Sequence, residues 1–384
     1  MINCWGVLQT ALIATTLKDV PISTTSFIGG VMVGMGGACS LLSLRVARRY
    51  GLRTTVIVGV LLMGFGALAG SWCTHSVPGL FITIGFLVGM GNSFVYNVTN
   101  ALPVQYFSGK LGLANGLIKL GGGVGGTIMA IALEALSRRV GVAWTFRIQG
   151  LMTLASGLPA AWLMKERVGL RNTPSFDTSM FKSVPYSTMF AAGAVGTFAL
   201  FVPPYYLPLF AQSIKLSSST GAALVAAFNA CTALGRFIGG PACDKIGAMN
   251  TFVIAMALNA ITMLGIWPVS STVAPLFIFA TVNGVANGAF FTVFPTVAAS
   301  IFGPGRAIVA MTMTITGLTP GYLLGAPIAG FLLQAAGGSK QGGNVLGVAA
   351  YRPAIFYAGG TALISCVLGI VARMIHAKGK GKKV

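Results

Sequence analysis

Long apolar stretches separated by short polar loops run along the whole chain. A helix needs roughly 20 mainly apolar residues to cross a bilayer. Windows of that kind lie at residues 25–43, 54–73, 79–101, 112–135, 146–164, 189–212, 220–242, 250–269, 274–297, 308–334 and 353–373. The pattern therefore predicts about 11 complete transmembrane helices. Residues 1–16 are apolar but too short to span alone, and they predict part of one more helix.

The polar segments predict the domain organisation and the orientation. The longest polar stretch, residues 165–185, follows the fifth complete span and predicts a cytoplasmic linker between two bundles. We expect an N-terminal helix bundle at 1–164, a linker at 165–188, a C-terminal bundle at 189–373 and a basic tail at 374–384. Most loop Lys and Arg residues fall on the side of the linker and tail, and the positive-inside rule places that side in the cytoplasm. The expected location is the plasma membrane, with a cytoplasmic C-terminus.

Composition supports this interpretation and excludes several other classes. The chain is 55% hydrophobic and only 8% charged, whereas a soluble domain carries about 25% charged residues. The net charge of +20 comes from basic residues between apolar stretches, not from a basic patch on a soluble fold, so we expect no nucleic-acid partner. The six cysteines lack paired spacing, and no metal cluster, catalytic triad or phosphate loop stands out. We expect no cofactor, no metal and no enzyme activity.

The two halves of the chain repeat each other. Gly89 and Asn92 match Gly284 and Asn287 at a shift of 195, and Gly51 matches Gly247 at a shift of 196. Internal repeats are typical of secondary transporters. The same shift places the start of the helix near residue 189 before residue 1 in the first half, so we expect the first helix to lack its opening residues. Complete halves would hold six helices each.

One loop motif resembles the signature of the major facilitator superfamily. Gly240, Asp244, Lys245 and Gly247 have the spacing of that signature, which lies between the second and third helices of a half. The first half keeps Arg49 and Gly51 but has Arg48 in the aspartate position. The resemblance implies an all-α membrane protein with the major facilitator fold, built as two six-helix bundles with a pseudo-two-fold repeat. It also implies gating roles for Asp244, Lys245 and Arg49.

A second motif resembles the fungal type of monocarboxylate-porter-like proteins. The segment from Tyr106-Phe107 through Lys110 to Leu113-Ala114 and Gly116 is similar to the signature that precedes the fifth helix in that family, although Gly109 replaces one expected basic residue. The resemblance implies a secondary transporter of a small organic acid, possible proton coupling, and a small anionic molecule and the lipid bilayer as partners. Two alternatives stay open. One is efflux of a secondary metabolite from a biosynthetic gene cluster, and the other is a non-transporting sensor or inactive remnant.

Two basic residues within predicted spans are candidate substrate ligands, because charge inside a bilayer is expensive and usually functional. Arg236 lies eight residues before Asp244, about 12 Å along a helix. Its planar fork suits a carboxylate, and the resemblance implies the same role. Related porters carry an aspartate one turn earlier, where this chain has Thr232. The alternative is structural packing of Arg236 against carbonyls and Asp244. Lys119 either attracts an anion or extends to the inner interface.

Other polar and aromatic residues are weaker candidates. Glu134 is the one acid within a span; it either carries a proton or, as we favour, pairs with Arg138 four residues on. Asn92 and Asn287 bind substrate or link helices, and linking is favoured. Tyr205 and its aromatic neighbours form a cavity wall or face lipid. Several prolines are expected to interrupt their helices: Pro203, Pro204, Pro208, Pro320 and Pro327.

Overall fold

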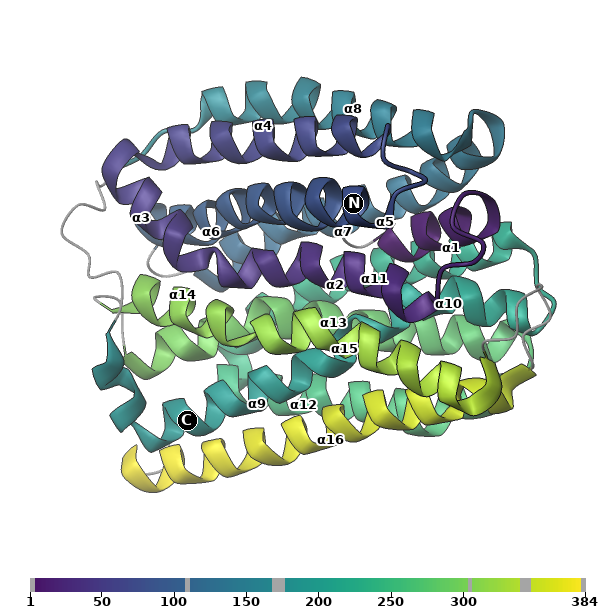
Figure 1. Cartoon of the computed structure of the whole chain (residues 1–384). Helices are drawn as coiled ribbons and strands as arrows, with labels where there is room; N and C mark the ends of the chain where they lie inside the picture. The colour runs from purple at the N-terminus through teal and green to yellow at the C-terminus, as the bar shows by residue number, and fades with distance from the viewer. Residues whose placement is uncertain (1–3, 108–110, 168–176, 303–305, 339–346, 381–384) are drawn as a thin grey trace.

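The computed structural model describes residues 4–107, 111–167, 177–302, 306–338 and 347–380, and within these ranges it contains helices and no strand (Figure 1). The helices of the first half are α1 (Trp5–Thr15), α2 (Ile22–Ala38), α3 (Ser40–Tyr50), α4 (Leu52–Gly70), α5 (Val77–Leu80), η2 (Phe81–Val88), α6 (Gly89–Tyr106), α7 (Leu111–Arg139) and α8 (Gly141–Leu163). Those of the second half are η3 (Thr178–Lys182), α9 (Val184–Leu200), α10 (Val202–Ser213), α11 (Ser218–Ile246), α12 (Ala248–Ile261), η4 (Thr262–Ile266), η5 (Trp267–Val269), α13 (Val273–Phe302), α14 (Ala307–Gly317), α15 (Thr319–Leu333), η6 (Gln334–Gly338) and α16 (Gly347–Lys380).

Most of these helices are long and apolar enough to cross a membrane. Among the described residues, nine helical stretches meet that standard, and α2 with α3, which meet at a bend of 48°, bring the total to ten. The predicted span at 146–164 corresponds to α8, which has 23 residues but is not among the ten. Its polar residues Arg147 and Gln149 make it less apolar than the others. The chain is an all-helical integral membrane protein, as predicted.

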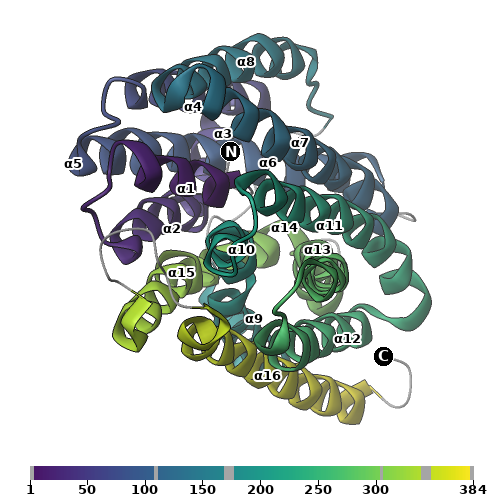
Figure 2. The same ribbon diagram turned by 90° about the vertical axis from the view of Figure 1, so that its right-hand side faces the viewer.

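The helices form two bundles that lie against each other. In the first half, α4 packs against α6 and α8, and α2 packs against η2 and α6. In the second half, α11 packs against α13, and α16 packs against α9 and α12. The view along the helices shows the first bundle above the second (Figure 2). The bundles meet mainly through α7 with α11 and α2 with α15, and α1 with α10 and α3 with α14 add further contacts.

The sequence repeat has a direct structural counterpart at one end of the bundles. Gly51 ends α3 with φ = 86°, and Gly247 ends α11 with φ = 90°, a left-handed conformation that glycine adopts without steric penalty. Four residues later, Thr55 and Thr251 each donate a hydrogen bond of 2.9 Å to the carbonyl of the corresponding glycine. This end also carries Arg49, and we call it the basic end. The same shift of 196 relates α10 to α1.

Helix ends near the linker and the C-terminal tail differ from the predicted boundaries. α9 begins at Val184, inside the expected linker, and α16 continues to Lys380, inside the expected tail. Asp177 accepts hydrogen bonds from the backbone and side chain of Ser179 and lies 3.7 Å from Arg306. The hydrogen bonds from Ser179 hold the pKa of the Asp177 carboxyl below its ordinary value, and the Arg306 charge adds a smaller effect in the same direction.

The prolines break only some of the helices that contain them. A break at Phe201, next to Pro203 and Pro204, separates α9 from α10, and a break at Leu318, before Pro320, separates α14 from α15. Pro208 and Pro327 instead lie inside α10 and α15, so the expectation that they interrupt their helices is wrong. A proline removes one helical hydrogen bond, and close packing by neighbouring helices can keep such a helix continuous.

Candidate functional site

A cavity of about 410 Å³ lies between the two bundles. The first half contributes residues of α2, α4, η2, α6 and α7 to its walls, and the second half contributes Phe201 and residues of α11, α13, α14 and α15. The polar, charged and aromatic residues that matter most for its chemistry are Asn92, Tyr96, Lys119, Arg236, Phe291 and Tyr322. A site between the two repeats of a transporter is accessible to both bundles.

Arg236 reaches the cavity from α11 and contacts both bundles. Its Nη1 donates a hydrogen bond of 3.1 Å to the Lys119 carbonyl on α7, and its Cζ lies 5.7 Å from the centre of the Phe291 ring. Its Nε is buried and has no hydrogen-bond partner among the described residues. A Cβ at Gly122 would lie 2.8 Å from Nη1, so a glycine there leaves room for the guanidinium.

Lys119 makes the reverse connection. Its Nζ donates a hydrogen bond of 2.7 Å to the Phe291 carbonyl on α13 and lies 5.9 Å from the centre of the Tyr96 ring. The ammonium therefore bonds to the opposite bundle instead of extending to the basic end. A side chain of α7 thus bonds to the second bundle, and a side chain of α11 bonds to the first.

The cavity has positive charge without a carboxylate. The chain has five acidic residues, and none of them lines the cavity: Asp19, Glu134, Glu166, Asp177 and Asp244. Thr232, one turn before Arg236, donates a hydrogen bond of 3.2 Å to the Gly284 carbonyl and so joins α11 to α13. A charged group away from water is costly unless it is paired. The two cations are therefore suited to bind an anion.

One wall of the cavity consists of glycines on α7. A Cβ at Gly121 or Gly125 would meet no atom within 4 Å. Their counterparts at a shift of 196, Gly317 at the end of α14 and Gly321 on α15, instead lie against Phe190 and Thr197 of α9. The two halves therefore differ here, because α9 covers the glycine face in the second half and the cavity borders it in the first.

Three other predicted site residues lie in different environments. Asn92 lines the cavity. Asn287 is buried and donates a hydrogen bond of 2.8 Å to the Leu200 carbonyl, which links α13 to the end of α9. Tyr205 is buried beside Phe201, with 5.9 Å between ring centres. Asn287 and Tyr205 are outside the cavity lining, and their substrate-binding roles stay predictions.

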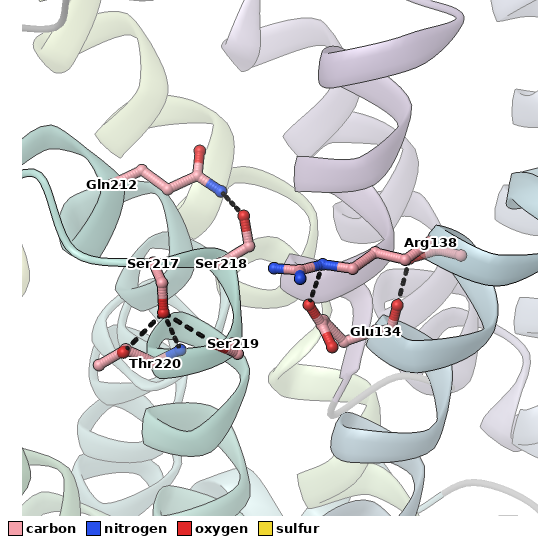
Figure 3. A network of polar contacts seen from close by, with 8 residues as sticks. Glu134, Arg138, Gln212, Ser217, Ser218, Ser219 and Thr220 are labelled. Atoms are coloured by element: carbon pink, nitrogen blue, oxygen red, sulfur yellow. Dashed lines mark hydrogen bonds and ion pairs between the residues drawn. The ribbon is translucent and has the colours of Figure 1, made fainter.

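The predicted gating and proton-coupling residues lie away from the cavity. Asp244 and Lys245 are exposed at the basic end of α11, and Arg49 is exposed at the end of α3. Glu134 forms an ion pair of 2.6 Å with Arg138, which confirms the pairing four residues apart. Figure 3 shows this pair together with the hydrogen bonds of the turn that begins α11. The gating and proton-coupling roles themselves stay predictions.

Several cavity residues were missed by sequence reasoning. Tyr96 and Phe291, which are counterparts at a shift of 195, line the cavity. Ile315 also lines it, and Ile315 is the counterpart of the predicted residue Lys119 at a shift of 196. Tyr96 also lies four residues after Asn92, on the same face of α6. Comparing whole helix faces between the two halves, and not single residues, would have identified Tyr96 and its counterpart Phe291.

Comparison with known proteins agrees with this architecture. The sequence pattern of the Major Facilitator Superfamily matches the chain over residues 2–228 and again over residues 187–384. The chain belongs to the Major Facilitator Superfamily. A major facilitator protein is a membrane transporter. The first match extends past the first bundle into α11, and the second match covers most of the second half of the chain.

The most similar major facilitator relatives include fungal efflux proteins. The agnestins efflux protein of Paecilomyces divaricatus is 30% identical over 341 residues, which are 86% of this chain and 76% of the relative. The aspyridones efflux protein of Emericella nidulans is 29% identical over 385 residues, 99% of this chain and 76% of the relative. The fujikurins efflux protein of Gibberella fujikuroi is 26% identical over 346 residues, which are 87% of this chain and 72% of the relative.

Proposed function

We propose that this transporter exports an anionic secondary metabolite across the plasma membrane. The two bundles would rock about the central cavity and expose it alternately to each side. The basic end would face the cytoplasm, together with the C-terminus. Arg236 would bind the acidic group of the substrate.

The observation that carries this proposal is the positive charge of the cavity. Lys119 and Arg236 line the cavity, and no acidic residue of the chain does. Arginine presents several N–H donors in a fixed planar arrangement that matches a carboxylate. An anion between the bundles would therefore neutralise charge that the protein leaves uncompensated.

The relatives support export and a substrate larger than a simple acid. Proteins that cover most of this chain are named for the efflux of agnestins, aspyridones and fujikurins. The cavity volume of about 410 Å³ is within the range of roughly 300–1,000 Å³ typical of pockets for drug-sized ligands. Both observations favour a secondary metabolite over a two- or three-carbon acid.

Movement of a small monocarboxylate is the second candidate. The segment from Tyr106 to Gly116 resembles the monocarboxylate-porter signature, and Arg236 has the position that this resemblance implies for a carboxylate ligand. Proton coupling through an arginine–aspartate pair has less support, because Thr232 occupies the position of the aspartate and bonds to Gly284.

Transport by the full chain in proteoliposomes tests the proposal. The panel contains agnestins, aspyridones, fujikurins and simple monocarboxylates, and counterflow is measured in both directions. We expect counterflow of at least one large metabolite, with loss of activity in Arg236→Met. Arg373→Met is the matched control, because Arg373 is an exposed residue of α16 outside the cavity.

The possible results separate the alternatives. Preference for simple monocarboxylates would support the second candidate. Counterflow by Arg236→Met at the parental rate would show that the anion site is assigned wrongly. If no compound moved in either direction, the transport proposal would fail and a sensor function would gain support.

A further inference from the structure

Lys119 and Arg236 form one connected cationic pair within the cavity. Arg236 donates to the carbonyl of Lys119 at 3.1 Å, and Lys119 donates to the carbonyl of Phe291 at 2.7 Å. Each charge also lies near an aromatic ring, with Lys119 5.9 Å from the Tyr96 centre and Arg236 5.7 Å from the Phe291 centre. The two charged groups come from opposite bundles but border the same space.

Both groups have donors available for a ligand. A guanidinium has five N–H donors and an ammonium has three. The structure gives each side chain one hydrogen bond to a carbonyl, and the Nε of Arg236 has no partner among the described residues. A neutral carbonyl accepts a weaker hydrogen bond than a carboxylate does. An incoming anion would therefore bind more strongly than the carbonyl contacts that it replaces.

A single carboxylate would leave the site only half neutralised. A carboxylate that pairs with Arg236 through two parallel hydrogen bonds uses both of its oxygens. Lys119, which is partly buried, would then keep a charge without a counter-ion, and a partly desolvated charge is costly when it is unpaired. None of the five acidic residues lines the cavity to compensate for it. A second acidic group on the substrate would remove this imbalance.

We propose that Lys119 is a second anion-binding residue and that the substrate carries two acidic groups. One group binds Arg236 and the other binds Lys119, and the substrate is a dicarboxylate or a carboxylate with a second ionised oxygen. The aromatic rings of Tyr96 and Phe291 favour an apolar, flat spacer between the two groups. This inference rests on the proposed transport of an anion and specifies its chemical class.

The test compares acids that differ in one charge but hardly in size. The probes are isophthalate and its monomethyl ester, and succinate and its monomethyl ester. Their binding to the purified full chain is measured by calorimetry in detergent. We expect each diacid to bind at least about tenfold more tightly than its half ester, since about 1.4 kcal/mol corresponds to a factor of ten.

Variants at Lys119 and Arg236 show which residue causes the preference for a diacid over its half ester. Lys119→Met should bind a diacid and its half ester equally, whereas Lys119→Arg, which keeps the charge, should retain the preference. Arg236→Met should weaken the binding of both members of each pair. The unfolding temperature of every variant is measured alongside, and Lys119→Arg shows the effect of altering the side chain without removing the charge.

Each result decides between the inferences. Equal binding of diacid and half ester by the parent protein, or a preference that survives in Lys119→Met, would overturn the two-group inference and leave the anion site intact. If the parent protein bound neither the diacids nor the half esters, the anion site and the proposed function would both fall.

Discussion

Replacing Arg236 by methionine should reduce transport without a large loss of stability. The substitution removes one hydrogen bond from a charged donor, worth about 1.5–3 kcal/mol, and a cation–π contact worth about 0.5–1 kcal/mol; the structure shows both. It also removes a charge whose placement near a helix centre costs about 2.5–3.5 kcal/mol on insertion scales. These amounts nearly cancel, so we expect the stability to change by about 1 kcal/mol or less.

The loss of transport should be much larger. Removing one partner of a buried charge pair costs about 2–5 kcal/mol, which predicts a decrease of about thirtyfold or more in anion affinity. Counterflow in proteoliposomes measures the activity, and thermal unfolding in the same lipids measures the stability. A variant that transported at the parental rate but unfolded at a much lower temperature would refute the reasoning. Arg236 would then be a structural residue that joins α11 to α7.

Three further predictions concern packing, a proton and a buried network. Gly123→Ala should lower stability and transport, because its Cβ would collide with Ala233 of α11, and overpacking costs about 1–3 kcal/mol. Gly125→Ala, with no atom within 4 Å of its Cβ, is the control for stability alone, because Gly125 borders the cavity. Equal effects of the two substitutions in unfolding assays would contradict this account. Glu134→Gln should change stability by only about 0.2–0.5 kcal/mol, because Glu134 pairs with Arg138 four residues away. The pH profile of counterflow should stay unchanged. A shifted profile would instead support proton coupling. Asn283→Ala should lower the free energy of unfolding by about 0.6–1.7 kcal/mol, because it removes hydrogen bonds to Asn259 and Thr262; an unchanged unfolding curve would show that the network contributes nothing.

The apolar pattern predicted the fold well because the bilayer imposes one simple length rule. Ten of the eleven windows correspond to described helices that are long and apolar enough to span, with α2 and α3 counted together. The match of Gly51 with Gly247 located the repeated turn that the structure confirms. Boundaries were less predictable. α9 starts at Val184 and α16 ends at Lys380, because helices extend beyond the hydrocarbon region and polar residues do not stop them.

The site was only partly predictable from the sequence. Arg236, Lys119 and Asn92 were recognised because charge or amide groups are unusual within apolar helices, and all three line the cavity. Asn287 was chosen by the same reasoning, and Tyr205 was chosen as one of the aromatic residues beside the prolines, but both lie outside the cavity lining. A helix that is apolar all round gives no periodic signal for the face that borders a cavity. Only packing against other helices determines which residues reach the substrate.

The bonds of Lys119 and Arg236 to main-chain carbonyls have a consequence for the driving force. Main-chain carbonyls carry no net charge, so an anion that binds Lys119 and Arg236 and leaves without a proton would carry its own charge. Where the cell interior is negative by 100 mV, each negative charge that leaves releases about 2.3 kcal/mol. That amount corresponds to a concentration ratio of roughly fiftyfold, and a second charge would square the ratio. The membrane voltage alone could then drive export against a steep gradient of the metabolite.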